Sequence, residues 1–423
     1  MNRTMKDSGI EWIGEIPESW ETCQIGHLYD ERKEKVSDRD YPPLSVTMKG
    51  IVPQLSTAAK TDAHDDRKLV KKGDFAINSR SDRRGSCGIS AYDGSVSLIN
   101  TILCPRNEMN PQYYDWLFHT TMFADEFYKW GHGIVDDLWT TNWSDMKKIG
   151  VPIPDLHEQS LIAAHLDRQC ALIDSVTEKT KASIEEYKKL RQAVITQAVT
   201  KGVRGDRPMK DSGIEWIGEI PEEWDVVPLT KKLKNIVDYR GKTPTKVKNG
   251  IFLVTAKNIK NGKIDYEISK EYVAANEYDE IMHRGMPQIG ELLFTTEAPL
   301  GAVANVDKEN IALAQRIIKF TPFDDVSPYF MKYWIMSDGF QQYLKTLSTG
   351  STATGIKASK LFMLPLIYLA IDEQQEIAAY LDKKCAEIDA LITKKETFLA
   401  ELEAYKKSLI YEYVTGKKEV PQA

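Results

Sequence analysis

Two nearly identical stretches, MKDSGIEWIGEIPESWE at 5–21 and MKDSGIEWIGEIPEEWD at 209–225, decide how this chain is organised. They match at 15 of 17 positions with an offset of 204 residues, which chance does not produce. Internal repeats of this kind indicate a duplicated architecture. A recent duplication without functional consequence is the simplest alternative, and a second repeat in the chain counts against it.

The second repeat is more diverged and follows each copy of the first. EQSLIAAHLDRQCALID at 158–174 aligns without gaps with EQQEIAAYLDKKCAEID at 373–389, at an offset of 215 residues. Toward the end of each segment, AVTKG at 198–202 aligns with YVTGK at 413–417. Between these shared segments lie two long regions with little common sequence. A repeated frame with divergent contents predicts one task performed on two different targets.

Residues 158–200 and 373–415 contain neither proline nor glycine and are rich in Ala, Lys, Glu, Leu and Gln, which predicts two long helices. Their apolar residues follow a heptad pattern, which indicates an antiparallel coiled coil with helices of roughly 60 Å. The alternative is that each helix packs on its own domain. The expected seam consists of Ile162, Leu166, Ile173, Val176, Leu190, Val194, Ile377, Leu381, Ile388, Leu391, Leu402 and Leu409.

The two divergent regions are rich in short β-type runs with Gly, Asn and Asp turns, and they are distant relatives of each other. KGDFAI at 72–77 and IGELLF at 289–294 each predict a turn and a strand that ends in a polar tip. We therefore expect an α+β protein, in which two mixed α/β domains are separated by two long antiparallel helices in a pseudo-two-fold tandem repeat. The expected parts are the first motif (1–21), the first variable domain (22–156), the central helix (157–203), a linker with the second motif (204–225), the second variable domain (226–371) and the C-terminal helix (372–418).

Basic residues are clustered although the chain as a whole carries a net charge of −6. Residues 231–263 hold ten basic residues and one acidic residue. Lys and Arg serve phosphate contacts, Arg can pair with guanine, and Asn or Gln can pair with adenine. A solvated face is the more ordinary explanation of any single cluster. The candidate DNA-contact residues are Arg80, Arg83, Arg84, Arg240, Lys242, Thr243, Lys257, Asn258, Thr295, Thr296, Gln315, Arg316, Thr352 and Thr354.

Motifs for catalysis are missing from the sequence. There is no GxGxxG, GxxxxGK[ST] or HExxH, and the methyltransferase loop [NDS]PP[YFW] does not occur. Five scattered cysteines form no CxxC pair, so we expect no metal site and a reducing, cytoplasmic location. No apolar run is long enough to span a membrane. A degenerate nuclease core is the remaining catalytic alternative, and we expect a protein without a catalytic residue of its own.

Six pieces of sequence resemble the specificity subunits of type I restriction-modification enzymes: GIEWIGEIPESW and its copy, EQSLIAAHLD and EQQEIAAYLD, and the helix ends AVTKG and YVTGK. RGKTP at 240–244 and GELLFTTEAPLGAVA at 290–304 are similar to stretches of their target-recognition domains. The resemblance implies that each variable domain reads one half of a split, asymmetric site in double-stranded DNA, and that the helices set the spacer between the halves.

The same resemblance implies partners. Two modification subunits would carry S-adenosylmethionine and methylate adenine, and two restriction subunits would use ATP and Mg²⁺ for translocation and cleavage. This chain itself would bind no cofactor. We expect the outer faces of the helix starts, including Glu158, Gln159, Glu373 and Gln374, to be free to meet these partners. The alternative in another class is a coiled-coil adaptor with two protein-binding domains.

Overall fold

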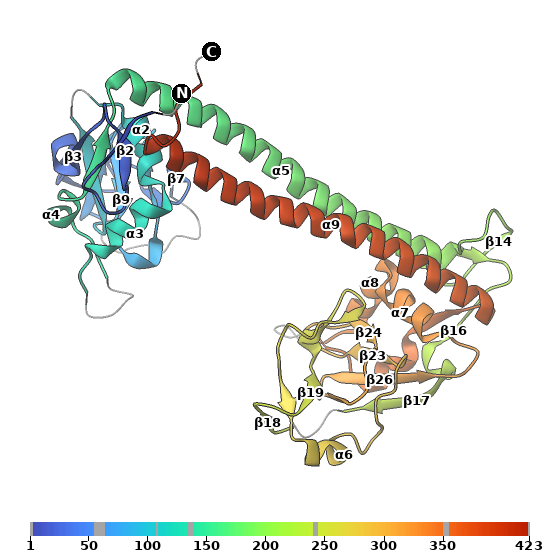
Figure 1. The fold of residues 1–423 in the computed structure, drawn as a ribbon. Coiled ribbons are helices and arrows are strands. Elements are labelled where there is room, and N and C mark those ends of the chain that lie inside the picture. The colour runs from blue at the N-terminus through green and yellow to red at the C-terminus, as the bar shows by residue number, and fades with distance from the viewer. Residues whose placement is uncertain are drawn as a thin grey trace. The chain divides into compact units, whose positions relative to one another are not determined.

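The computed structural model describes residues 3–54, 64–106, 109–133, 139–239, 244–349 and 355–421. It divides into two compact units, of which unit 1 comprises Met1–Lys181 with Thr397–Ala423 and unit 2 comprises Ala182–Glu396 (Figure 1). The division falls within the two long helices, so each helix contributes one part to each unit. No helix in the described ranges is long and apolar enough to cross a membrane.

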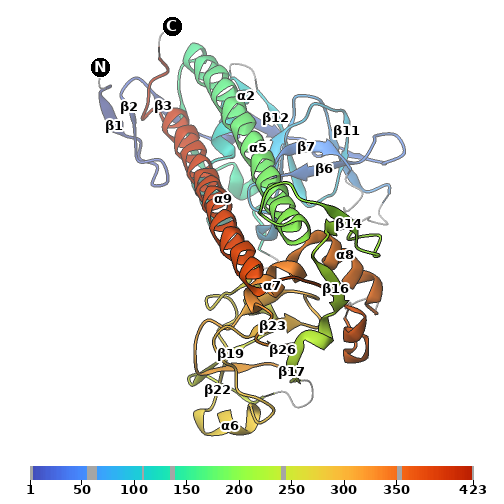
Figure 2. The same cartoon turned by 90° about the vertical axis from the view of Figure 1, so that its right-hand side faces the viewer.

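The two long helices are α5 (Leu156–Lys201) and α9 (Ile371–Val414), close to the expected ranges. In unit 1, Asp174 of α5 pairs with Lys406 of α9 at 2.6 Å. In unit 2, Arg191 of α5 pairs with Asp389 of α9 at 2.9 Å. His165 of α5 also contacts Tyr413 of α9 in unit 1, and Lys395 of α9 lies over the ring of Tyr187 of α5 in unit 2. Rising residue numbers on one helix therefore meet falling numbers on the other within each unit, so the segments are antiparallel, which confirms the expectation (Figure 2).

The contact line between the helices differs from the expected heptad seam. Val176, Leu190 and Leu391 are 41%, 48% and 43% exposed, so their assignment to the seam is wrong. From Ile162 to Ile195 the covered positions of α5 span 33 residues in nine steps, or about 3.7 residues per step. A seam extrapolated at 3.5 residues per step therefore falls one residue short in the middle of each helix. One line of covered positions runs through 162, 166, 170, 173, 177, 180, 184, 187, 191 and 195 in α5 and through 381, 385, 388, 392, 395, 399, 402, 406 and 410 in α9, with further covered positions such as 165, 194 and 409 beside it.

The remaining seam residues are covered to different degrees. Val194 and Leu402 are half-buried. The buried residues are Ile162, Leu166, Ile173, Ile377, Leu381, Ile388 and Leu409.

The first variable domain is built on a four-stranded sheet in the order β10-β9-β12-β4. Because side chains alternate along a strand, Phe75 and Ile77 of β9 enter a core shared with the helices, whereas Ala76 enters a second core with Leu44 and Val70. The sheet is thus covered by α2 and α3 on one face and by smaller sheets on the other. The elements are β4 (Tyr29–Glu31), β5 (Lys35–Val36), β6 (Leu44–Thr47), β7 (Gly50–Pro53), β8 (Arg67–Val70), β9 (Phe75–Asn78), β10 (Cys87–Ile89), β11 (Gly94–Val96), β12 (Asn100–Pro105), α2 (Pro111–Phe118) and α3 (Thr121–Lys129).

The second variable domain repeats this plan with the sheet order β17-β26-β23-β24. Leu292 and Phe294 of β23 enter the core with the helices, and Leu293 between them enters a core with the sheet β18-β22-β19-β25. The central sheets of the two domains therefore share one strand order despite the divergent sequences, whereas the smaller sheets beside them are paired differently. The elements are β17 (Leu233–Asp238), β18 (Lys246–Val247), β19 (Ile251–Val254), β22 (Tyr272–Val273), α6 (Tyr278–Ile281), β23 (Leu292–Thr295), β24 (Val303–Asn305), β25 (Ile311–Leu313), β26 (Ile317–Pro322), α7 (Pro328–Met336) and α8 (Asp338–Leu347).

Each 17-residue motif forms a small hairpin that lies against a long-helix end. Strands β1 (Met5–Asp7) and β2 (Glu15–Pro17) pair, as do β14 (Met209–Asp211) and β15 (Glu219–Pro221). The first hairpin shares its core with Ile410 and Val414 at the end of α9, and the second shares its core with Val199 at the end of α5.

A pair of strands closes each domain at its base. The entering strand β3 (Glu21–Gln24) pairs with the leaving strand β13 (Gly150–Ile153), and β16 (Asp225–Pro228) pairs with β27 (Pro365–Tyr368). Each domain is therefore closed directly before a long helix begins.

Candidate nucleic-acid interface

Both domains carry the same four-residue turn ahead of their longest strand. In the first domain the amide of Asn100 donates to the carbonyl of Ser97 at 3.1 Å, and in the second Ile317 donates to Ala314 at 3.1 Å. We call 97–100 and 314–317 the tip turns. In each domain the loop after the neighbouring strand bonds to the tip turn, because Ser79 donates to Ile99 at 3.2 Å and Thr296 donates to Arg316 at 3.0 Å.

A third segment joins the same end of each sheet. Arg80 forms a β-bridge with Thr140, and Glu297 forms the equivalent bridge with Gly355. Three chain segments therefore meet at one end of each central sheet, and we call this end the tip. The same backbone arrangement carries different side chains in the two domains.

The tip of the second domain has a basic hollow of about 240 Å³, lined by Lys246, Lys257, Gln315 and Arg316. Two of its cations have carboxylate partners, because Arg316 pairs with Glu297 at 2.9 Å and Lys246 pairs with Glu271 at 2.7 Å. Burial disfavours the charged form of Glu271, but the Lys246 ammonium, the Ser269 hydroxyl and the charge of Lys257 together outweigh burial and lower its pKa. The structure thus brings together three sequence candidates, Lys257, Gln315 and Arg316.

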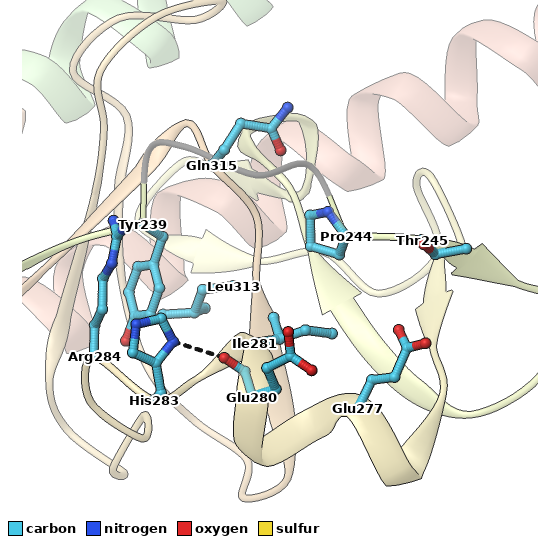
Figure 3. Close-up of a pocket in the computed structure, with 10 residues that line it drawn as sticks. All are labelled: Tyr239, Pro244, Thr245, Glu277, Glu280, Ile281, His283, Arg284, Leu313 and Gln315. Carbon is cyan, nitrogen blue, oxygen red and sulfur yellow. Dashed lines mark hydrogen bonds between the residues drawn. The ribbon is translucent and has the colours of Figure 1, made fainter.

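A second hollow of about 190 Å³ adjoins the first, and Gln315 lines both (Figure 3). The Tyr239 hydroxyl donates to the carbonyl of Gly285, and Arg284 donates to the carbonyl of Asp238 at 2.7 Å. The Nδ1 of His283 lies 2.7 Å from the carbonyl of Glu280. Tyr239, His283 and Arg284 were not among the residues expected at the site, since the sequence around them mixes both signs of charge and carries no recognisable motif.

The basic cluster of the first domain lies on the loop after β9. Arg83 is exposed and lies 3.9 Å from Asp82. Arg84 pairs with Asp125, and its guanidinium lies 5.3 Å from the centre of the Tyr128 ring. Arg80 is half-buried beside the bridge to Thr140. Arg83 is therefore better placed than Arg84 for a phosphate contact.

The prediction that Asn258, Thr295 and Thr296 contact DNA is wrong, because their side chains are buried and hydrogen-bonded within the protein. Asn258 is fully buried, its amide donates to the carbonyl of Asp265 at 2.9 Å, and its oxygen accepts from the backbone of Thr255 at 2.9 Å. The hydroxyl of Thr295 donates to Pro299 at 2.6 Å, and that of Thr296 donates to Arg316 at 3.3 Å. These side chains stabilise the loops that present Lys257 and Arg316. Arg240, Lys242, Thr243, Thr352 and Thr354 lie outside the described residues.

The expectation that the helix starts are free for partners is also wrong. Gln159, Glu373 and Gln374 are buried, and Glu158 accepts a hydrogen bond from Trp20. The side-chain oxygen of Gln159 accepts a hydrogen bond from the backbone N–H of Asn110 at 2.8 Å. The side-chain oxygen of Gln374 accepts one from the backbone N–H of Ser327 at 2.8 Å.

These contacts reach into the variable domains. Asn110 and Ser327 are the N-cap residues of α2 and α7. The shared Glu-Gln pair therefore fixes each long helix to its own domain.

Comparison with known proteins agrees with this geometry. The family model of the type I restriction modification DNA specificity domain matches residues 17–186 and 221–403. The chain therefore belongs to the type I restriction-modification specificity subunits and carries two specificity domains, as the sequence resemblance predicted.

Two named relatives match to different extents. The type I restriction enzyme MjaVIII specificity subunit of Methanocaldococcus jannaschii is 26% identical over 95% of this chain and 93% of its own length. The EcoBI specificity subunit of Escherichia coli is 26% identical over 63% of this chain and 58% of its own.

Solved structures share the fold. A chain from the structural work on complex assembly and conformational transition of the type I R-M system has a TM-score of 0.72, with 13% identity, over 95% of this chain and 99% of its own. The HsdS subunit from Thermoanaerobacter tengcongensis has a TM-score of 0.53, with 16% identity, over 95% and 98%.

Proposed function

We propose that each variable domain reads one half of a split, asymmetric site in double-stranded DNA through its tip. The observation that carries this proposal is the shared tip with exchanged side chains: Gln315 and Arg316 in one turn correspond to Leu98 and Ile99 in the other. A fixed backbone with variable exposed residues suits two readers of different sequences. Phosphate contacts position such a reader and base contacts give its specificity.

The long helices would set the distance between the half-sites and dock the catalytic partners. The Glu-Gln contacts at each helix start support this role, because they couple the orientation of each domain to its helix. The partners we propose are two modification subunits and two restriction subunits. S-adenosylmethionine, ATP and Mg²⁺ would be bound by those partners, and this chain would steer methylation and cleavage without a catalytic residue.

The test is to express the chain with its modification subunit and to map adenine methylation across the host genome by long-read sequencing. A new split motif, methylated once on each strand, is the expected result, and exchange of one variable domain should change only one half. Co-purification of the two subunits without any new methylated motif would contradict DNA recognition. Failure of the subunits to associate would favour the adaptor with two protein-binding domains.

A further inference from the structure

The tip turn of the first domain has an unusual composition. Its central residues, Leu98 and Ile99, are adjacent, apolar and 39% and 36% exposed. Turns are usually formed by Gly, Pro, Asn, Asp and Ser, and the β-branched side chain of Ile favours strands. A single exposed apolar residue is ordinary on a protein surface. Two adjacent exposed apolar residues at the centre of a turn are unfavourable in water, which indicates that they have a function outside folding.

Folding does not require these two residues. The second domain closes the same turn with Gln315 and Arg316, at the same 3.1 Å distance and with the same bond to the neighbouring loop. The turn therefore tolerates polar side chains at both positions. The apolar pair in the first domain is best explained by what the turn contacts outside the protein.

The surroundings of the pair indicate a polyanion as the partner. The amide of Ser79 donates to the carbonyl of Ile99, and the next residue along the chain is Arg80. Arg83 and Arg84 follow on the same loop. Arg83 is the exposed cation of this loop, whereas Arg84 pairs with Asp125. An apolar turn beside such a loop is complementary to the major groove of DNA, where phosphates flank base edges and the thymine 5-methyl group is an apolar feature of those edges.

We propose that Leu98 and Ile99 read thymine methyl groups in the first half-site by apolar contact. The second domain then reads its half-site by hydrogen bonds from Gln315 and Arg316. The two halves are recognised by different chemistry on the same backbone turn. This inference rests on the proposed function, since it names the residues and the base feature through which one tip would act.

The test uses the full chain in complex with its modification subunit and a DNA duplex that carries the mapped methylation motif. Each thymine of the first half-site is replaced in turn by uracil, which lacks only the methyl group. We expect one or two positions at which uracil weakens binding by roughly 3- to 10-fold, as expected for loss of one or two methyl contacts. The effect of uracil in the second half-site on affinity should be the same whether or not Leu98 and Ile99 are replaced.

The Leu98→Ser/Ile99→Ser double variant should weaken binding by a similar factor and abolish the sensitivity to uracil. Tyr92→Ser is the matched control, because Tyr92 is exposed and lies beyond Ile89, which pairs with Phe75 at the opposite end of β9 from the tip. The control should retain both affinity and uracil sensitivity. The uracil series on the unchanged protein does not depend on how the variants fold.

Three results would overturn the inference. One is a wild-type complex that is insensitive to uracil at every thymine of the first half-site. Another is a double variant that keeps the uracil sensitivity. The third is a double variant that binds DNA normally and no longer associates with the modification subunit, which would make the turn a protein contact. If the wild-type complex methylates no specific site, the proposed function itself is wrong, and that result is distinct from the other three.

Discussion

The indole Nε1 of Trp20 donates a hydrogen bond to a carboxylate oxygen of Glu158 at 2.7 Å, which ties the first 17-residue motif to the start of α5. Trp224 makes the same contact with Glu373 at 3.2 Å at the start of α9. An arginine completes each cluster, because Arg3 pairs with Glu158 and Arg207 pairs with Glu373. The same three types of side chain therefore anchor both long helices, and the tryptophan of each cluster is the one that belongs to the 17-residue motif.

Replacement of Glu373 by alanine should destabilise unit 2 by about 3 kcal/mol, because it leaves a buried indole without its acceptor and removes one of the two carboxylate partners of the mostly buried Arg207, which keeps Glu223. Urea unfolding of the full chain measures this change. Glu376→Ala is the matched control, since Glu376 is half exposed and pairs with Arg204 at 2.8 Å. The control should cost less than about 1 kcal/mol. Equal losses in the two variants would contradict the role of the Trp-Glu-Arg cluster.

The shifted seam gives a second pair of variants. Leu381→Asp introduces a charge at a buried position of α9 and should destabilise the protein by more than about 3 kcal/mol and prevent association with the modification subunit. Leu391→Asp changes a residue that the heptad pattern also places on the seam but that is 43% exposed, and it should change stability by less than about 0.5 kcal/mol. Thermal unfolding and co-purification are the measurements. Strong destabilisation by the Leu391 variant would show that the helices pack on the heptad line, and unchanged co-purification of the Leu381 variant would show that association does not need this contact of α9.

Much of the architecture could be predicted from the sequence because repeats and helix propensity are local signals. Both long helices begin within two residues of the expected starts, and α5 ends two residues before 203, whereas α9 ends at Val414, four residues before 418. The seam was wrong at Val176, Leu190 and Leu391 because a strict 3.5-residue pattern falls one residue short of the covered positions 177, 191 and 392. The common strand order of the two central sheets could not be derived from the sequence, because it depends on pairings between strands that are distant along the chain.

The candidate site was predicted in part. Arg316, Gln315 and Lys257, which line one hollow, could be predicted as candidates because basic and amide side chains in loops can be recognised in the sequence. Asn258 and Thr296 have the same chemistry but bond to their own loops, and only burial distinguishes the two cases. The tip turn at Leu98 and Ile99 carries no polar signal, so a search for basic clusters could not find it.

The adjacent residues Lys257 and Asn258 should respond differently to alanine. Lys257 is exposed in the basic hollow, so Lys257→Ala should weaken binding to all duplexes alike. It should also reduce the slope of log affinity against log salt concentration by about one. Asn258 is buried, so Asn258→Ala should lower the free energy of unfolding by about 2 kcal/mol. Binding titrations at several salt concentrations, together with urea unfolding, separate the two effects. If Lys257→Ala leaves the salt slope unchanged, the hollow does not contact phosphate.

The ion pair between Arg316 and Glu297 predicts that the second tip restrains its own affinity for DNA. Glu297 holds the guanidinium at 2.9 Å and places a negative charge where phosphates and base edges would approach. Glu297→Gln removes that charge while keeping the shape and an amide oxygen, so affinity for unrelated duplexes should rise roughly 5-fold at low salt, about 1 kcal/mol. Affinity for the mapped site should rise less, because Arg316 loses the partner that orients it, and discrimination at one base pair of the second half-site should relax.

Glu309→Gln is the matched control for that variant. It removes the same charge from an exposed residue beyond Asn305, which pairs with Leu292 at the opposite end of β23 from the tip. The control should change neither affinity nor discrimination, since screening weakens the effect of a distant surface charge. Competition titrations with target and unrelated duplexes measure both quantities. An equal response of the two variants would mean that net charge, and not the Arg316–Glu297 pair, governs binding at this tip.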